Sequence, residues 1–264
     1  MHVDKFQVYV QREIPLPQGA DASKITTAIV LDQDGTVRHV PTYVTKRDGS
    51  AYAVVNSLTN SSYSLIWHPM TFADVEQHWA KDAVNDMASR LVVNGVDERR
   101  YQPDAHITRA EFAAVIVRAL GLSDRGQTAG FTDVKPGDWY AGAVAKAHEY
   151  GIIQGYEDGT FRPLNPITRE ETMVMIARAM KLVGLRTEIG CEDAAQALTS
   201  FADGQSVSEW AKQAAAALVS QELVKGTEAK QLLPLSFISR AETAAVVQRM
   251  LIKANLIDIN HSKY

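Results

Sequence analysis

Residues 131–173 read FTDVKPGDWYAGAVAKAHEYGIIQGYEDGTFRPLNPITREETM, and this pattern occurs three times in the chain of 264 residues. The other two copies start at residues 72 and 201, and their ITREE segment is replaced by ITRAE and ISRAE. In every copy a glycine follows a tryptophan after 16 positions, and an arginine follows that glycine after 14. The residues in register are Asp74, Asp133 and Asp203; Trp79, Trp139 and Trp210; Gly95, Gly155 and Gly226; and Arg109, Arg169 and Arg240. Identical spacing in three copies predicts a repeat architecture, in which neighbouring units bury each other's apolar faces.

Each repeat is expected to contain two helices. The first begins near the tryptophan, which opens an apolar face continued by residues such as Ala83 and Met87, and it ends before the glycine. The second begins at a capping box, the pairs being Thr108 with Glu111, Thr168 with Glu171, and Ser239 with Glu242. Three apolar stripes on the second helices predict a central three-helix core and a pseudo-threefold assembly with grooves between its units.

The first 69 residues have a different pattern. Short alternating apolar stretches are separated by Asp34-Gly35 and Asp48-Gly49, which are hairpin signals. We therefore expect a mainly α chain with a small β-rich module in front. The predicted division is residues 1–69, the end of a β-sandwich-like module, and repeats at 70–124, 125–186 and 187–264.

The composition limits the possible functions. The net charge is −4, which gives no reason to expect nucleic acid as a partner, and no apolar run is long enough for membrane insertion. The single cysteine, Cys191, excludes an internal disulfide, and no histidine pair has metal-binding spacing. The N-terminus lacks a signal pattern and begins abruptly in strand-like sequence, so we expect a fragment of a longer chain.

The compound motif FTDV, Trp139, GIIQGYEDGTFRP and ITREE resembles the S-layer homology (SLH) domain family, over residues 71–257. The resemblance implies a three-repeat spindle that anchors a secreted protein noncovalently to the bacterial cell wall and cell surface. The implied partner is a secondary cell wall polysaccharide carrying pyruvylated N-acetylmannosamine. We also expect a non-enzymatic, monomeric module without cofactor or metal. Such modules often end S-layer proteins or large extracellular glycoside hydrolases.

The motif arginines are the first candidates for binding a carboxylate. Arg109, Arg169 and Arg240 fall at the first helical position, where free backbone N–H groups and the helix dipole favour an anion. A guanidinium can hold the ketal carboxylate with two hydrogen bonds. The alternative is that each arginine pairs with a nearby Asp or Glu at the helix start.

The other residues in register complete the predicted carbohydrate site, each with an alternative role. The tryptophans either stack on a sugar or pack in the core. The aspartates either cap the first helix or accept sugar hydroxyl groups. The glycines either let a sugar ring approach the backbone or end the first helix in a left-handed conformation. A further arginine nine positions after each motif arginine (Arg118, Arg178, Arg249) is expected to form structural ion pairs.

Two repeats depart from the family motif, and two other functions compete with wall anchoring. Repeat one lacks the Asp-Gly turn of YEDGTFRP, and repeat three has TEAKQLLPLSF there, so a groove that depends on that loop is expected to bind poorly. A glycoside hydrolase would need two carboxylates about 5–10 Å apart, but Glu111, Glu171 and Glu242 are used in capping boxes. A protein–protein module for S-layer lattice assembly is the alternative.

Overall fold

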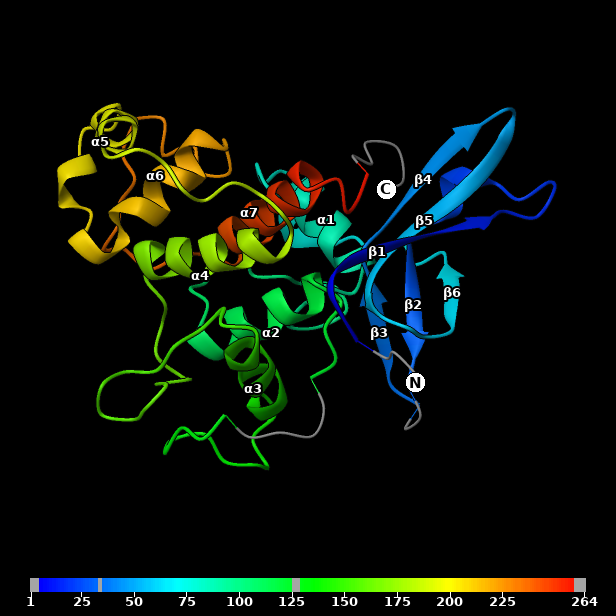
Figure 1. The fold of residues 1–264 in the computed structure, drawn as a ribbon, viewed down its shortest axis with the longest axis horizontal. Helices are drawn as coiled ribbons and strands as arrows, with labels where there is room; N and C mark the ends of the chain where they lie inside the picture. The colour runs from blue at the N-terminus through cyan, green and yellow to red at the C-terminus, as the bar shows by residue number, and fades with distance from the viewer. Residues whose placement is uncertain (1–4, 33–34, 125–128, 259–264) are drawn as a thin grey trace. The chain divides into compact units, whose positions relative to one another are not determined.

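The computed structural model describes residues 5–32, 35–124 and 129–258 (Figure 1). In these ranges six strands precede seven α-helices. The strands are β1 (Lys5–Pro15), β2 (Thr27–Leu31), β3 (Val37–Val40), β4 (Thr42–Arg47), β5 (Ser50–Thr59) and β6 (Tyr63–Ile66). The helices are α1 (Lys81–Ser89), α2 (Arg109–Ala119), α3 (Ala141–Glu149), α4 (Arg169–Leu182), α5 (Cys191–Thr199), α6 (Lys212–Ser220) and α7 (Arg240–Lys253).

The chain divides into two compact units, and the division passes through repeat one. Unit 1 consists of Met1–Pro103, Val115–Ser123 and Leu251–Tyr264, and unit 2 of Asp104–Ala114 and Asp124–Met250. Helices α2 and α7 contribute to both units. The unit with the strands therefore also holds α1 and two helix ends, and it is larger than the segment before residue 70.

Unit 1 contains two antiparallel three-stranded sheets, ordered β1-β5-β4 and β3-β2-β6 (Figure 1). Small and β-branched residues form a core between strands, namely Ala28, Val30, Val40 and Val55. The predicted hairpin at Asp48-Gly49 is confirmed: both residues have positive φ and they join β4 to β5. Asp34 of the other predicted hairpin lies outside the described residues.

A buried arginine that the sequence reasoning did not single out joins three segments of unit 1. Arg90, just after α1, is fully buried and forms ion pairs with Asp86 and Asp258. Its Nη1 also donates to the carbonyl of Thr42 at the start of β4, at 2.9 Å. Two carboxylates and a carbonyl offset the cost of burying the charge, so α1, β4 and residues near position 258 are held together.

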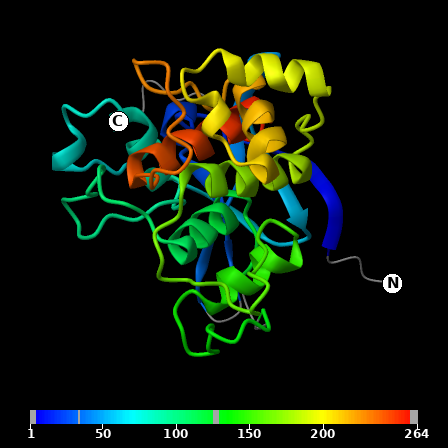
Figure 2. The ribbon, with the colours of Figure 1, turned by 90° about the vertical axis from the view of Figure 1, so that its left-hand side faces the viewer.

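Unit 2 contains α3 to α6, the first turns of α2 and most of α7. Helix α6 packs against both α4 and α5 (Figure 2). Helix α5 lies in the lengthened connection between repeats two and three, where the sequence reasoning placed no element. Its two buried residues, Ala194 and Leu198, are four positions apart and face α6 in one stripe.

Three isoleucines that precede the motif arginines form a closed ring of backbone hydrogen bonds in unit 2. The amide of Ile107 donates to the carbonyl of Ile238, that of Ile238 to Ile167, and that of Ile167 to Ile107, at 3.1–3.2 Å. The same segments form isolated bridges between His106 and Ser239, Thr108 and Pro166, and Thr168 and Phe237. Each repeat thus meets both others immediately before its second helix.

Candidate functional site

The three capping boxes are confirmed at the ring. The N-cap amides of Thr108, Thr168 and Ser239 donate to Glu111, Glu171 and Glu242 at 2.8–2.9 Å, and the N3 amides donate back to the hydroxyl groups. These bonds start α2, α4 and α7 at the motif arginines. Each arginine therefore occupies the first helical position, as the sequence predicts.

The expectation of free N–H groups at these helix starts is wrong. The amides of Arg109 and Ala110 donate to the carbonyls of Asn165 and Pro163, and those of Arg169 and Glu170 to Ser236 and Pro234. The amide of Arg240 donates to Ala105. Because the loop of the next repeat supplies these acceptors, the helix starts have few donors left for an external anion.

Each motif arginine reaches a capping-box glutamate of another repeat. Arg109 Nη1 lies 2.8 Å from Glu171 Oε1, Arg169 Nη1 pairs with Glu242, and Arg240 Nη1 lies 3.8 Å from Glu111 Oε1. The Nε groups of Arg109 and Arg169 donate to the carbonyls of Phe161 and Leu232, at 2.9 and 2.6 Å. The guanidinium groups therefore link the repeats. Of the two roles expected for the motif arginines, the structure shows the ion pair with a protein carboxylate.

Among the described residues, aromatic rings lie close to the guanidinium of Arg109 but not to that of Arg169. The guanidinium of Arg109 lies 4.9 Å from the ring centre of Tyr156 and 4.8 Å from that of Phe161. At the corresponding positions near Arg169, repeat three has Thr227 and Leu232. Burial raises the pKa of Tyr156, whose hydroxyl donates to Glu171 at 2.9 Å.

The motif aspartates hold the loop after the glycine. Asp133 accepts hydrogen bonds from the amides of Phe161 and Arg162, at 2.8 and 2.7 Å, and Asp203 accepts them from Leu232 and Leu233, both at 2.7 Å. Asp74 does the same for Tyr101 and Gln102. The first helices have no side-chain cap, so capping is not the role of these aspartates in the structure.

The motif glycines sit against their own repeat. A Cβ on Gly95, Gly155 or Gly226 would lie 2.4–2.6 Å from the Phe ring of the Phe-x-Asp motif and 2.8–2.9 Å from a loop carbonyl. The left-handed positions that follow the first helices are Leu91, Gly151 and Glu222, four residues earlier. Only Gly226 has positive φ itself, so ending the helix is not the reason for glycine at 95 and 155.

The three motif tryptophans are exposed. Trp79, Trp139 and Trp210 keep 62%, 63% and 59% of their surface accessible. The expectation that each tryptophan lies on the buried face of the first helix is wrong. Each first helix begins two residues after its tryptophan, at Lys81, Ala141 and Lys212. The indole faces are consequently available to a ligand.

The expected ion pairs of the second arginine set are also wrong where the structure describes the contacts. Arg178 donates to Gln154 Oε1 at 2.7 Å and to the carbonyl of Ile152 at 3.5 Å. Arg249 donates to the carbonyl of Leu223 at 3.1 Å. These acceptors are neutral, and burial lowers the pKa of both guanidinium groups. The sequence signal for these arginines was their equivalent position in the three repeats. An equivalent position does not show whether the acceptor is neutral or a carboxylate.

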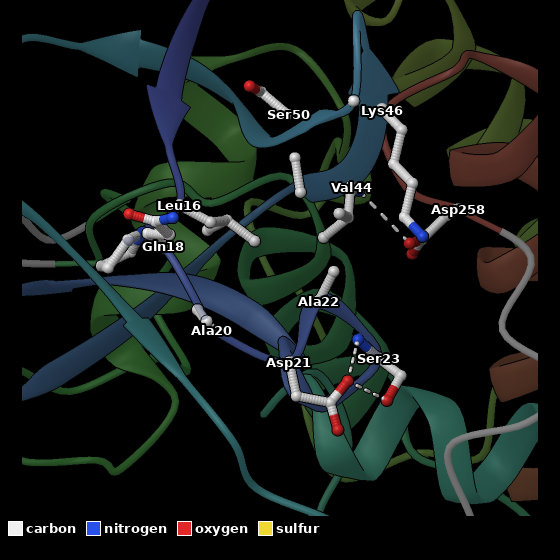
Figure 3. Close-up of a pocket in the computed structure, with 14 residues that line it drawn as sticks. Leu16, Gln18, Ala20, Asp21, Ala22, Ser23, Val44, Lys46, Ser50 and Asp258 are labelled. Carbon is white, nitrogen blue, oxygen red and sulfur yellow. Dashed lines mark hydrogen bonds between the residues drawn. The ribbon is translucent and has the colours of Figure 1, made fainter.

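Two hollows lie within single units. In unit 2, Arg178 and Lys181 of α4 face Trp210 and Gln213 across a groove of about 350 Å³, together with Thr187 and Glu188. In unit 1, a wider hollow of about 890 Å³ is lined by residues 16–23 and, from other segments, by residues that include Lys46, Ser50 and Asp258 (Figure 3). There Asp21 accepts hydrogen bonds from Ser23, and Asp258 accepts one from the amide of Val44 (Figure 3). The unit 2 groove differs in offering an aromatic face beside two cations.

Neither a metal centre nor a membrane span is found in the described ranges. No group of three or more His, Cys, Asp or Glu side chains could hold a metal ion there. None of the described helices has the length and apolar character needed to cross a bilayer. Cys191 is a free, exposed thiol at the start of α5.

Comparison with known proteins defines the class of this chain. The sequence profile of the S-layer homology domain matches residues 71–113, 130–173 and 200–244, which are half of the chain. The chain belongs to the S-layer homology domain family and carries three of its repeats.

Its relatives are long proteins. An amylopullulanase of Thermoanaerobacterium thermosulfurigenes is 37% identical over 214 residues, covering 80% of this chain and 11% of the relative. The exoglucanase XynX of Acetivibrio thermocellus is 37% identical over 201 residues, covering 75% and 18%. The surface-layer 125 kDa protein of Lysinibacillus sphaericus is 32% identical over 174 residues, covering 65% and 14%. The chain thus spans less than a fifth of the length of each.

Proposed function

We propose that this chain is a cell-surface anchor that binds a secondary cell wall polysaccharide noncovalently. Its family and the surface-layer relatives support a secreted, cell-wall location. The glycosidase relatives support the use of such a module beside a catalytic domain. On this proposal the three repeats are an anchor, and any enzymatic activity belongs to other parts of a longer protein.

The observation that carries the carbohydrate proposal is the exposure of three equivalent tryptophans. Burying an indole contributes a large hydrophobic free energy, so a sequence that keeps it exposed at the same place three times forgoes that gain. An aromatic face with a nearby polar group suits a sugar ring, whose C–H face is apolar and whose hydroxyl groups need partners. We propose Trp79, Trp139 and Trp210 as ligand contacts.

We further propose that the carbohydrate is acidic, with pyruvylated N-acetylmannosamine as the recognised unit, and that Arg109, Arg169 and Arg240 hold its carboxylate. Each of these arginines already binds a carboxylate, and the Nη2 groups of Arg109 and Arg169 make no hydrogen bond to other described residues. A ligand carboxylate would use that donor, or exchange with the glutamate. The aspartates and glycines in register would shape the site through the loops that they hold.

We also propose that the three repeats form a pseudo-threefold spindle, with the second helix of each repeat in its central core. The domain boundaries proposed with it are 1–69, 70–124, 125–186 and 187–264. The closed ring of Ile107, Ile167 and Ile238 supports the threefold arrangement at the helix starts. The partner is the wall polysaccharide, and we expect the chain itself to be a monomer.

Calorimetric titration of the whole chain with pyruvylated N-acetylmannosamine tests the function. We expect saturable binding, and a loss of at least about tenfold in affinity for the same sugar without its ketal, since a charge-assisted hydrogen bond contributes about 1.5–3 kcal/mol. Equal binding of both sugars would contradict the anion mechanism. Sedimentation velocity of the chain without sugar addresses the lattice alternative, which requires self-association at micromolar concentration.

A further inference from the structure

The β-rich segment of unit 1 meets the end of α2, the second helix of repeat one. Helix α2 has 11 residues, whereas α4 and α7 have 14 each. Position 121 is a glycine with a φ of 65°, while the residues in register with it, Lys181 and Ile252, are still helical. A Cβ on Gly121 would lie 2.9 Å from Pro41 and 3.1 Å from the carbonyl oxygen of His39. Repeat one therefore ends its second helix early, at the place where the β3–β4 connection packs against it.

The strands also supply hydrogen-bond donors to the end of α2. The last carbonyl groups of a helix have no partner within that helix. The hydroxyl of Tyr9 on β1 donates to the carbonyl of Leu120 at 2.8 Å, and Arg38 on β3 donates to the carbonyl of Gly121. The guanidinium charge of Arg38 also suits the negative end of the helix dipole. The end of α2 is therefore capped by side chains that lie 111 and 83 residues earlier in the chain.

The same segment contacts the ends of α1 and α7. Asn56 on β5 donates to the carbonyl of Leu256, three residues after α7, at 3.1 Å. Asp258 accepts a hydrogen bond from the amide of Val44 on β4 at 3.3 Å, and it pairs with Arg90, which follows α1. Because α1 and α2 belong to repeat one and α7 to repeat three, the strands join the first repeat to the last.

We propose that the β-rich segment is a cap of the repeat assembly, and that it folds and unfolds together with the helix ends that it covers. Leu120 and Leu256 are buried, and buried helix ends need donors for their last carbonyl groups. The amylopullulanase relative matches 80% of this chain, which is more than residues 70–264 make up, so the similarity extends into the segment. The change of sequence pattern near residue 70 is therefore no folding boundary. This role is independent of the ligand proposed for the repeats.

Amide hydrogen exchange of the whole chain tests whether strands and helix ends unfold together. Val55→Ala weakens the segment from within, because Val55 is fully buried in a cluster made only of residues of the β-rich segment. We expect the amides of β5 and those of Leu120 and Leu256 to exchange faster together, by about tenfold or more. Arg47→Gln is the control within the same segment, since its ion pair with Glu13 lies on the surface. It should leave all these rates within about twofold.

A second variant keeps the test decisive if Val55→Ala does not fold. Tyr9→Phe removes only the hydroxyl that caps Leu120, and exchange at the end of α2 should accelerate by about three- to tenfold, as expected for one lost hydrogen bond. Tyr43→Phe is its matched control, because that hydroxyl forms no hydrogen bond with another described residue. Faster exchange of the β5 amides alone in Val55→Ala would overturn the cap, and so would unchanged exchange at the end of α2 in Tyr9→Phe. Either result would leave the wall-binding proposal untouched.

Discussion

The surroundings of Arg109 and of Arg169 share a backbone and differ in side chains. Both guanidinium groups donate through Nε to a loop carbonyl and through Nη1 to a capping-box glutamate. Both loops are held by an aspartate at equivalent backbone amides. Around Arg109 the loop adds two aromatic rings, whereas around Arg169 it has Thr227 and Leu232. The comparison shows that the motif aspartate and glycine keep the loop backbone alike in both repeats, while the loop side chains near the arginine differ.

The largest expected effect separates the two arginines directly. Arg109→Ala should lower the free energy of unfolding by about 3–4 kcal/mol, because it leaves Glu171 without its cation and removes two aromatic contacts. Arg169→Ala should cost about 1 kcal/mol less, since no ring faces that guanidinium at the equivalent positions. Urea denaturation of both variants measures the difference. Equal losses would show that the rings add nothing to the stability of the Arg109 site.

A smaller effect tests whether the scaffold is the same in both repeats. Gly155→Ala and Gly226→Ala should each destabilise the chain by about 2–3 kcal/mol, because the new Cβ would meet a Phe ring and a loop carbonyl at less than 3 Å. Gly137→Ala is the matched control, since no atom lies within 4 Å of its Cβ position, and it should change stability by less than about 0.5 kcal/mol. If only one of the two motif glycines tolerated alanine, the scaffolds would differ after all.

The smallest effect belongs to the Asp158-Gly159 pair of a turn that repeat three forms with Ala229-Lys230 instead. Asp158 accepts hydrogen bonds from Thr160 and Arg162, which lower its pKa from 3.8 to about 2. The stabilisation is therefore present above about pH 4 and is lost as the pH falls toward 2. The third repeat has Ala229 at this position.

Circular dichroism melts between pH 5 and pH 2.5 test the contribution of this turn. We expect the Tm of the wild type to fall more steeply with pH than that of Asp158→Asn, which cannot titrate. Parallel Tm profiles of the two proteins would show that the low pKa is unrelated to folding.

Much of the fold was predictable because its signals are local. The capping boxes, the start of each second helix at a motif arginine and the Asp48-Gly49 turn depend on residues a few positions apart. Helix α5 was missed because its short Ala194–Leu198 stripe appears in one repeat only. The left-handed ends of the first helices were misplaced by four residues because two of them, Leu91 and Glu222, are not glycine.

The candidate site was predictable only as a set of residues. Register selected the aspartates, glycines, tryptophans and arginines together, but it could not tell which contacts each would make. The three aspartates bind loop amides some 27–30 residues away in sequence, and the tryptophans point to solvent rather than into the core. Helical periodicity predicted the opposite for the tryptophans, because each stands just before its helix begins.

By itself, the sequence determined that the chain has three equivalent units, where their second helices begin, and which family they belong to. These properties follow from spacing and from side chains that cap their own backbone. Only the tertiary structure decided that the helix-start amides and the motif arginines bind groups of another repeat. It also decided that Arg178, which borders the same groove as Trp210, binds a neutral acceptor rather than a carboxylate. Partners that are distant in sequence are chosen by how the repeats close on one another, and the energy of a buried charge depends on that choice.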